Sequence, residues 1–221
     1  MKLWNKEHTQ TAARTEEFTV GRDREFDLLL AEHDVLGSIA HVTMLGEAGL
    51  MEPKESAAAL EGLRQILEEV RAGKFRIEEG VEDVHSQVEM MLTARIGDAG
   101  KKIHSGRSRN DQVAVDIKLY LRASLQRVSG EMQALFNQLL RRSDELKDLL
   151  LPGYTHLQVA MPSSFGLWLG AYAESLVDDM EMLAAAYAVA NKNPLGSGAG
   201  YGSSFPLQRK RTTELQGFAT L

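Results

Sequence analysis

Two short polar segments of this 221-residue chain carry the side chains best suited to chemistry: SRNDQ at residues 108–112 and GYTHLQ at residues 153–158. The first is expected at the start of a helix, where unpaired backbone N–H groups and a partial positive charge favour anions. Arginine, hydroxyl and amide groups at such a position suit a carboxylate or a phosphate. The second segment contains a histidine, which titrates near neutral pH and suits proton transfer.

Each segment also has a purely structural interpretation. Ser108 or Asn110 can cap the helix, with Arg109 as surface charge, and His156 can be an exposed loop residue. His85 follows two carboxylates near a helix start, where it can line a site or simply end a helix. The pattern alone leaves these alternatives open.

Other candidate features are weaker. His33 and His41 are eight residues apart and are interpreted as structural, and no metal-ligand spacing is found, so no metal site is predicted. The glycine-rich segment 193–202 can cradle an anion with backbone N–H groups or form a turn between helices. It lacks the lysine and the preceding strand of a phosphate-binding loop, which argues against a nucleotide.

Composition excludes several classes of function. The net charge of −6 and the pI near 5.6 argue against a nucleic-acid or membrane-surface partner. The chain has no cysteine, so disulfides and thiolate chemistry are excluded. The N-terminus has no apolar signal core and no later apolar run is long enough to cross a bilayer, so a cytoplasmic location is expected.

Hydrophobic periodicity predicts an all-α protein without a convincing set of strands. Residues 1–20 are expected to form a loosely packed arm, 74–80 a connector with Phe75 and Ile77 in a short extended piece, and 98–108 a loop with a basic cluster. Helices are expected over residues 24–46, 53–72, 84–97, 110–150, 164–190 and 206–217. Pro152-Gly153 is expected to end the fourth helix, which at ~1.5 Å per residue would span about 60 Å. Its apolar stripe must pack against other long helices, in this chain or in partner subunits.

Taken together, SRNDQ, GYTHLQ and Pro194–Ala199, in this order and spacing, closely resemble the argininosuccinate lyase family of the fumarase/aspartase superfamily. Leu3-Trp4 and Glu82–His85 also fit that family. The resemblance implies a fumarase/aspartase-like fold, with a helical N-terminal domain at residues 1–108 and the first part of a central long-helix bundle at 109–221.

The resemblance further implies reversible elimination of fumarate from argininosuccinate, which releases arginine. It implies a homotetramer with active sites built from three subunits, and neither a metal nor an organic cofactor. His156 is then the residue assigned to proton transfer. The implied substrate-binding residues are Ser108, Arg109, Asn110, Thr155, His85 and Gln158.

Two departures from the family are visible. Asn5–His8 stands where family members have Gly-Gly-Arg-Phe, and a substrate-contacting serine has no clear counterpart near Thr19–Asp23. The superfamily's loop with the catalytic serine is absent. Gly202–Pro206 is rejected as that loop because no Lys or Asn-Pro follows at the required positions. The chain is therefore expected to be the N-terminal part of a longer lyase and inactive alone. The alternatives are a sister enzyme (adenylosuccinate lyase or fumarase), a crystallin-like structural protein, or an assembly module.

Overall fold

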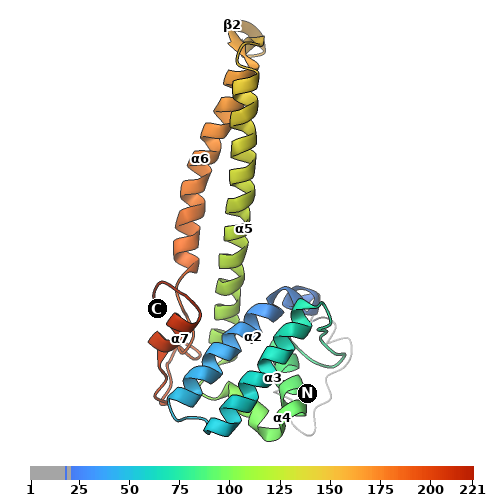
Figure 1. The fold of residues 1–221 in the computed structure, drawn as a ribbon, viewed down its shortest axis with the longest axis vertical. Helices are drawn as coiled ribbons and strands as arrows, with labels where there is room; N and C mark the ends of the chain where they lie inside the picture. Colours follow the sequence, from blue (N-terminus) through green and yellow to red (C-terminus); the bar gives the residue numbers. More distant parts are fainter. Residues whose placement is uncertain (1–17, 19–20) are drawn as a thin grey trace. The chain divides into compact units, whose positions relative to one another are not determined.

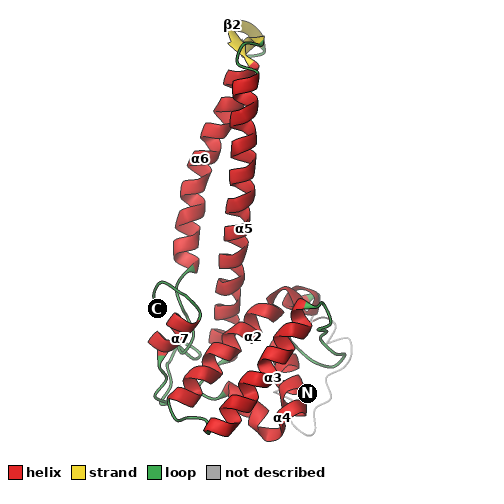
Figure 2. Ribbon diagram, viewed as in Figure 1, coloured by secondary structure: helices red, strands yellow, loops and turns green. Residues whose placement is uncertain are grey.

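The computed structural model describes Phe18 and residues 21–221, which are mostly helical (Figures 1 and 2). The chain forms two compact units, one comprising residues up to Tyr120 together with Asn191–Leu221, and the other Leu121–Ala190. The expected arm at residues 1–20, with Leu3 and Trp4, lies outside the described residues apart from Phe18. The predicted domain boundary at residue 108 stays a prediction.

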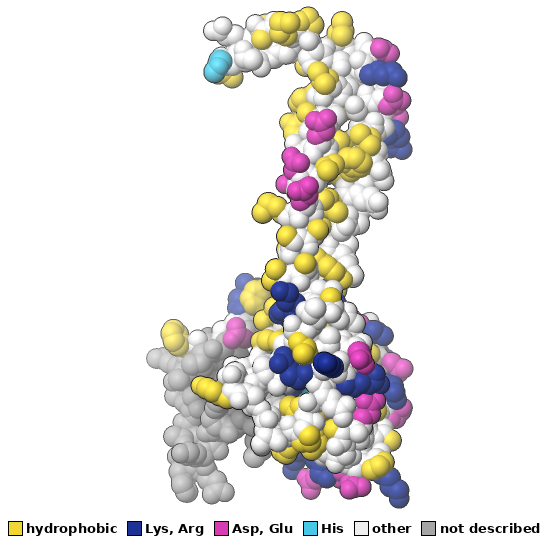
Figure 3. Space-filling model, turned by 90° about the vertical axis from the view of Figure 1, so that its left-hand side faces the viewer, with side chains coloured by type: hydrophobic (Ala, Val, Ile, Leu, Met, Phe, Trp, Pro, Cys, Tyr) yellow, Lys and Arg dark blue, Asp and Glu magenta, His cyan; other side chains and the backbone are white. Residues whose placement is uncertain are grey.

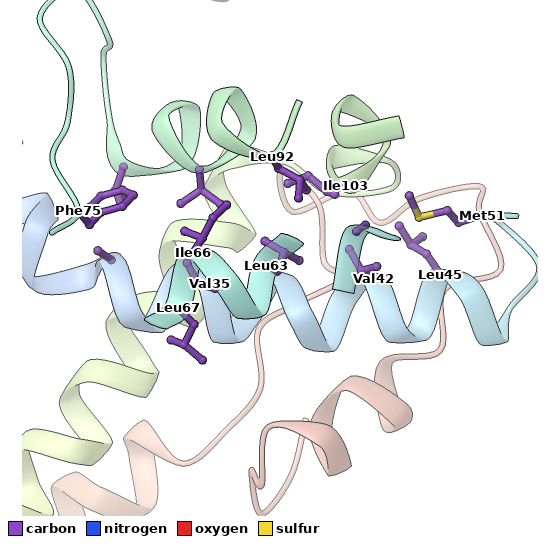
Figure 4. Packing of buried hydrophobic residues seen from close by; sticks show 14 of the residues in the cluster. Val35, Val42, Leu45, Met51, Leu63, Ile66, Leu67, Phe75, Leu92 and Ile103 are labelled. Atoms are coloured by element: carbon purple, nitrogen blue, oxygen red, sulfur yellow. The ribbon is translucent and has the colours of Figure 1, made fainter. Parts of the chain in front are cut away.

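The first unit is built on three packed helices, α2 (Asp23–Glu47), α3 (Pro53–Arg71) and α4 (Val84–Ile96) (Figure 1). Local sequence sets two of their starts: Pro53 occupies the first turn of α3, and Asp83 caps α4 by accepting the Ser86 N–H at 2.7 Å. Large apolar side chains from all three helices fill the space between them, as Figure 4 shows for Val35, Leu63, Ile66 and Leu92, among others. These three helices match the predicted ones closely.

Local predictions for this unit were only partly correct. The expected loop at 98–108 begins as a 3-10 helix, η1 (Gly97–His104). The segment with Phe75 is a connector as expected, and Phe75 itself is buried. Phe26 and Leu29, which follow the helical spacing of apolar residues in α2, are 56% and 57% exposed. By length and composition α2 does qualify as a possible membrane span, but more than half of the qualifying stretch is buried in this unit.

Helix α5 (Arg109–Glu145) begins in the first unit and continues into the second. Its 37 residues correspond to about 55 Å at 1.5 Å per residue. The second unit pairs its later part with α6 (Phe165–Ala190), and the Ser143 hydroxyl donates to the Gly166 carbonyl oxygen at 2.6 Å. A Cβ on Gly166 would lie 2.5 Å from the carbonyl oxygen of Ser143, so the small residue permits this close approach.

The connection between α5 and α6 differs from the prediction. The helix ends at Glu145, before Pro152-Gly153, and an antiparallel hairpin follows, formed by β1 (Leu150–Thr155) and β2 (Gln158–Ser164). These are the only strands among the residues that the structure describes (Figure 2). The sequence offers Ser163 or Ser164 as the cap of α6, and Ser164 takes this role by accepting the Leu167 N–H at 3.1 Å.

The chain then returns to the first unit through the glycine-rich segment and α7 (Arg209–Leu215). The Asn193 amide donates to the hydroxyls of Thr212 and Thr213 at 3.0 and 2.9 Å. These buried bonds fix α7 against the beginning of the glycine-rich segment.

Candidate functional site

The SRNDQ segment forms the first turn of α5. The Gln112 N–H donates to the Ser108 carbonyl oxygen at 3.2 Å, which makes Ser108 the residue that caps the helix. Its hydroxyl accepts from the backbone N–H of Asn110 at 3.3 Å and from the Asn110 amide at 3.2 Å. Asp111 completes the arrangement by accepting the Ser108 N–H at 2.8 Å, the reciprocal bond of a capping box.

The glycine-rich segment does cradle an anion with its backbone, and that anion is the side chain of Asp111. One carboxylate oxygen of Asp111 accepts the N–H groups of Gly196 and Gly198 at 2.8 and 3.0 Å. Both glycines have positive φ values of 91° and 60°, a conformation that glycine adopts without a Cβ clash. Asp111 therefore joins two of the motifs, a role that the sequence analysis missed.

Arg109 is held on three sides rather than lying free on the surface. Its Nε forms an ion pair with Asp83 at 3.3 Å, its Nη2 donates to the Ser86 hydroxyl at 3.2 Å, and its Nη1 donates to the Gln112 side-chain oxygen at 3.3 Å. Its side chain is 25% exposed. Each terminal nitrogen carries a second N–H that these three partners do not engage, and such a pair suits a carboxylate.

His85 is buried in the first unit rather than exposed on an open wall. It is 4% exposed, and its Nδ1 is 2.7 Å from an oxygen of Asp34 and 3.4 Å from one of Asp116. The same Asp34 oxygen accepts the Gln112 amide at 2.7 Å. His85 is thus linked to Arg109 through Asp34 and Gln112; its predicted contact with substrate stays a prediction.

The carboxylates beside His85 are in opposite electrostatic situations. Burial raises the pKa of Asp34, but His85, Arg107 and Gln112 outweigh it and bring that pKa down to about 2. Burial and the neighbouring Asp34 raise the pKa of Asp116 well above its ordinary value. The cluster therefore holds one firmly ionised carboxylate beside one that favours its proton.

Asp34, His85 and Asp116 are also close enough to share a cation, since one ligand atom of each lies within 4.8 Å of the others. Two observations weigh against a divalent ion there. The buried guanidinium of Arg107 adds a positive charge that helps to lower the pKa of Asp34, and Asp34 already accepts two hydrogen bonds. Both of those bonds fall on one oxygen of Asp34, whereas its other oxygen and both oxygens of Asp116 are buried without a hydrogen-bond partner among the described residues.

The remaining cations of the predicted basic cluster are engaged within the unit. Lys101 pairs with Asp98 at 2.8 Å and Lys102 with Glu55 at 2.6 Å. Arg107 is buried and donates to the Ser38 hydroxyl at 3.1 Å. Burial, Arg107 and Arg109 lower the pKa of His104 to about 4, so it is neutral at pH 7. Arg109 is the member of the cluster whose geometry best suits an external anion.

The GYTHLQ segment forms the tip of the hairpin in the second unit. Thr155 and Gln158 are paired across the strands, and His156 and Leu157 form the two-residue turn between them. Both turn residues have positive φ, 48° and 64°, as a type I′ turn requires. The side chains at this tip are exposed, with Leu157 99% exposed. Thr155, His156 and Gln158 therefore lie together at the exposed tip of the hairpin.

The sequence pattern of a family described as "Lyase" matches residues 6–220. The chain belongs to this lyase family. Proteins called argininosuccinate lyase from Bacteroides fragilis and Bacteroides thetaiotaomicron are 62% and 60% identical over 220 residues, which is all of this chain and 49% of each relative. The chain thus spans about half the length of the curated relatives it matches.

Solved structures agree with the family assignment. An EDDS lyase in complex with formate is 29% identical, with a TM-score of 0.78 over 96% of this chain and 42% of that one. A fumarate lyase:delta crystallin from Brucella melitensis, bound to cobalt, is 17% identical with a TM-score of 0.74, covering 89% of this chain and 48% of that one. The second likeness concerns the fold alone.

The structure therefore gathers the predicted site residues of this chain into two groups. Ser108, Arg109 and Asn110 share the first turn of α5, with His85 behind them. Sequence reasoning missed the residues that hold this group, Asp34, Asp111 and Gln112. Asp111 and Gln112 stand inside the motif itself, which was the available signal; Asp34 is 78 positions from Gln112 and gave none.

Proposed function

We propose that the whole protein containing this chain is an argininosuccinate lyase, which eliminates fumarate from argininosuccinate and releases arginine. The observation that carries the proposal is the 62% identity to a protein of that name along the entire chain. The geometry of Arg109 supports it, because a guanidinium held on three sides is prepared for one of the substrate's carboxylates. A cytoplasmic location is part of the same proposal.

The proposed roles follow from the chemistry of the reaction. Removing a proton from the carbon beside a carboxylate drives negative charge onto that carboxylate. Donors such as Arg109, Asn110, Ser108 and Thr155 stabilise this charge, and each oxyanion donor contributes roughly 3 kcal/mol in other enzymes. His156 moves a proton, either directly or through a partner group, and Gln158 and His85 complete the proposed binding residues. No metal or organic cofactor enters this proposal.

We further propose that the active site combines residues of different subunits. Arg109 begins α5, and that helix alone is about 55 Å long before it ends at Glu145. One small substrate does not reach both ends of such a helix. The first turn of one subunit's α5 would therefore meet the hairpin tip of another.

The second unit offers a surface suited to such an assembly. Its two helices expose many large apolar side chains, spread along α5 and α6 (Figure 3). Two mainly apolar grooves lie between these helices, one beside Phe136 and Met180 and one beside Leu125 and Leu183. Exposed apolar area of this extent favours burial against further helices. Helices of second and further copies of the chain, in a tetramer, are the proposed occupants.

The first experiment measures fumarate release, by its ultraviolet absorbance, from argininosuccinate and from adenylosuccinate with the whole protein. Turnover of argininosuccinate is expected. Turnover of adenylosuccinate alone would indicate a sister lyase, and no turnover of either would favour a structural protein. The 221-residue chain alone is expected to be inactive; clear turnover by it would refute that expectation.

Variants then test the two groups of residues. Arg109→Met is expected to lower kcat/KM by about 10²–10³-fold, and His156→Ala by about 10²–10⁴-fold. Arg71→Met is the matched control, since Arg71 is an exposed arginine of the same unit that pairs with Glu32. Mixing the two inactive variants during assembly should restore part of the activity if sites are shared. A mixture as inactive as its parents would contradict shared sites.

A further inference from the structure

We infer that Gln112 is a positioning residue for Arg109, which it holds in register with the buried Asp34–His85 pair; this rests on the proposed function of Arg109. Gln112 lies one helical turn after Arg109 on α5 and is 3% exposed. It stands between two groups of opposite charge, the carboxylate of Asp34 and the guanidinium of Arg109. A neutral amide suits both groups, because its NH2 group can donate to the carboxylate and its oxygen can accept from the guanidinium.

The orientation of the Gln112 amide is determined by its two partners. Its Nε2 donates to Asp34 at 2.7 Å, and its Oε1 accepts from Arg109 at 3.3 Å. The guanidinium of Arg109 only donates, and an ionised carboxylate only accepts. A flipped amide would place two donors together at Arg109 and two acceptors together at Asp34. Only one orientation therefore satisfies both bonds.

Asp34 is held in turn by a residue of another helix, His85 of α4. Asp34 is fully buried on α2, and His85 lies 2.7 Å from the same oxygen that accepts from Gln112. Burial raises the pKa of Asp34, but its cationic neighbours bring it to about 2, so the carboxylate remains an acceptor at neutral pH. The sequence of contacts His85–Asp34–Gln112–Arg109 thus spans α4, α2 and α5.

The other contacts of Arg109 do not replace Gln112. Asp83 and Ser86 both lie at the start of α4 and bind Nε and Nη2. Gln112 binds Nη1, so it is the partner on α5 that sets how the guanidinium is turned relative to the first turn of that helix. Loss of this bond frees Nη1 and allows the plane of the guanidinium to move.

The test compares Gln112→Met with wild type in the whole protein, because methionine has similar length but makes neither hydrogen bond. The value of kcat/KM for argininosuccinate is expected to fall about a hundredfold, the size of effect associated with a displacement of about 1 Å at a reacting group. Inhibition by fumarate is expected to weaken as well, because the affected group binds a carboxylate.

A double-mutant cycle separates positioning from general structural damage. If Gln112 acts through Arg109, Gln112→Met changes activity less than about twofold when Arg109 is already methionine. Val115→Ala is the control, since Val115 is a buried neighbour on α5 that packs with Leu119. Its effect should be the same with or without Arg109. An equal loss from Gln112→Met in both backgrounds would overturn the inference.

Two further measurements apply if Gln112→Met does not fold or if the wild-type protein is inactive. If Gln112→Met does not fold, Gln112→Glu takes its place and should lower kcat/KM about a hundredfold. Adding Asp34→Asn should recover most of that kcat/KM, because residue 34 then donates the hydrogen bond and residue 112 accepts it. No recovery would overturn the inference. If the wild-type protein releases no fumarate, the proposed function fails, and crystal structures decide the inference. The plane of the Arg109 guanidinium should turn in Gln112→Met but not in Val115→Ala, and an unmoved guanidinium in Gln112→Met would overturn the inference.

Discussion

His41 is expected to make the first unit sensitive to mild acid. It is fully buried on α2, and its Nε2 lies 2.8 Å from the carbonyl oxygen of Ser105, which can only accept. Nε2 therefore carries the hydrogen of the neutral ring. Burial, with the nearby charge of Arg107, lowers the pKa of His41 from 6.5 to about 3.

The sign and size of the effect follow from that pKa. The folded-state pKa is below the unfolded value, so between pH 6.5 and about 3 the unfolded chain binds the proton and the folded chain does not. Stability is therefore complete above pH 6.5 and is lost as the pH falls. One pH unit corresponds to about 1.36 kcal/mol, which gives a loss of about 2 kcal/mol at pH 5.

The assay is urea unfolding at pH 7 and pH 5, at one fixed protein concentration, for wild type and His41→Gln. A glutamine amide can donate to Ser105 but does not titrate, so it removes the proton uptake and keeps a donor. Wild type is expected to lose about 2 kcal/mol more than the variant between the two pH values. The two proteins will differ at pH 7 for packing reasons, so the comparison uses only the change with pH. An equal loss in both would refute the reasoning.

Three other predictions concern the packing, the hairpin and the buried carboxylate. Gly166→Ala places a Cβ 2.5 Å from the Ser143 carbonyl oxygen and should lower the free energy of unfolding by about 1–3 kcal/mol. Gly170→Ala is the control, because its Cβ would lie 3.4 Å from the nearest neighbour, and it should not lower that free energy. Similar urea curves for both variants would contradict this prediction. Leu157→Gly should stabilise the hairpin turn by about 1 kcal/mol, so a lower melting temperature would argue against strain there. Burial raises the pKa of Asp116, so its ionisation in the folded protein costs stability as the pH rises. Relative to Asp116→Asn, wild type should therefore lose stability between pH 5 and pH 8, and an equal change with pH in the two proteins would contradict this.

Local sequence predicted most of the helices because their boundaries depend on neighbouring residues. Pro53, Asp83 and Ser164 each act within one turn of the helix they begin, so the residues beside each start are enough to place it. The hairpin was missed for the same reason. Its turn is His156-Leu157 rather than the Asn-Gly that usually marks a type I′ turn, so the sequence carried no local signal.

The candidate site was predictable as a set of residues but not as a network. His85 was left between two interpretations because its partner, Asp34, lies 51 positions earlier in the chain. Asp111 was read as part of a polar motif, yet it binds backbone groups more than 80 positions later. Such contacts depend on how the helices of the first unit pack, and no spacing rule within one helix reveals them.

The two groups of predicted site residues differ in how firmly their side chains are held within this chain. Arg109 is preorganised by bonds from α4 and α5 that exist before any substrate binds, so little ordering remains to oppose binding of a carboxylate. His156 stands at an exposed hairpin tip, in a backbone conformation that costs roughly 1 kcal/mol for a residue with a Cβ. A proton-transfer group gains most where water is excluded and its partners are fixed. If His156 is that group, its surroundings must be completed by another part of the assembled protein, whereas the contacts that hold Arg109 for its proposed role are already formed within this chain.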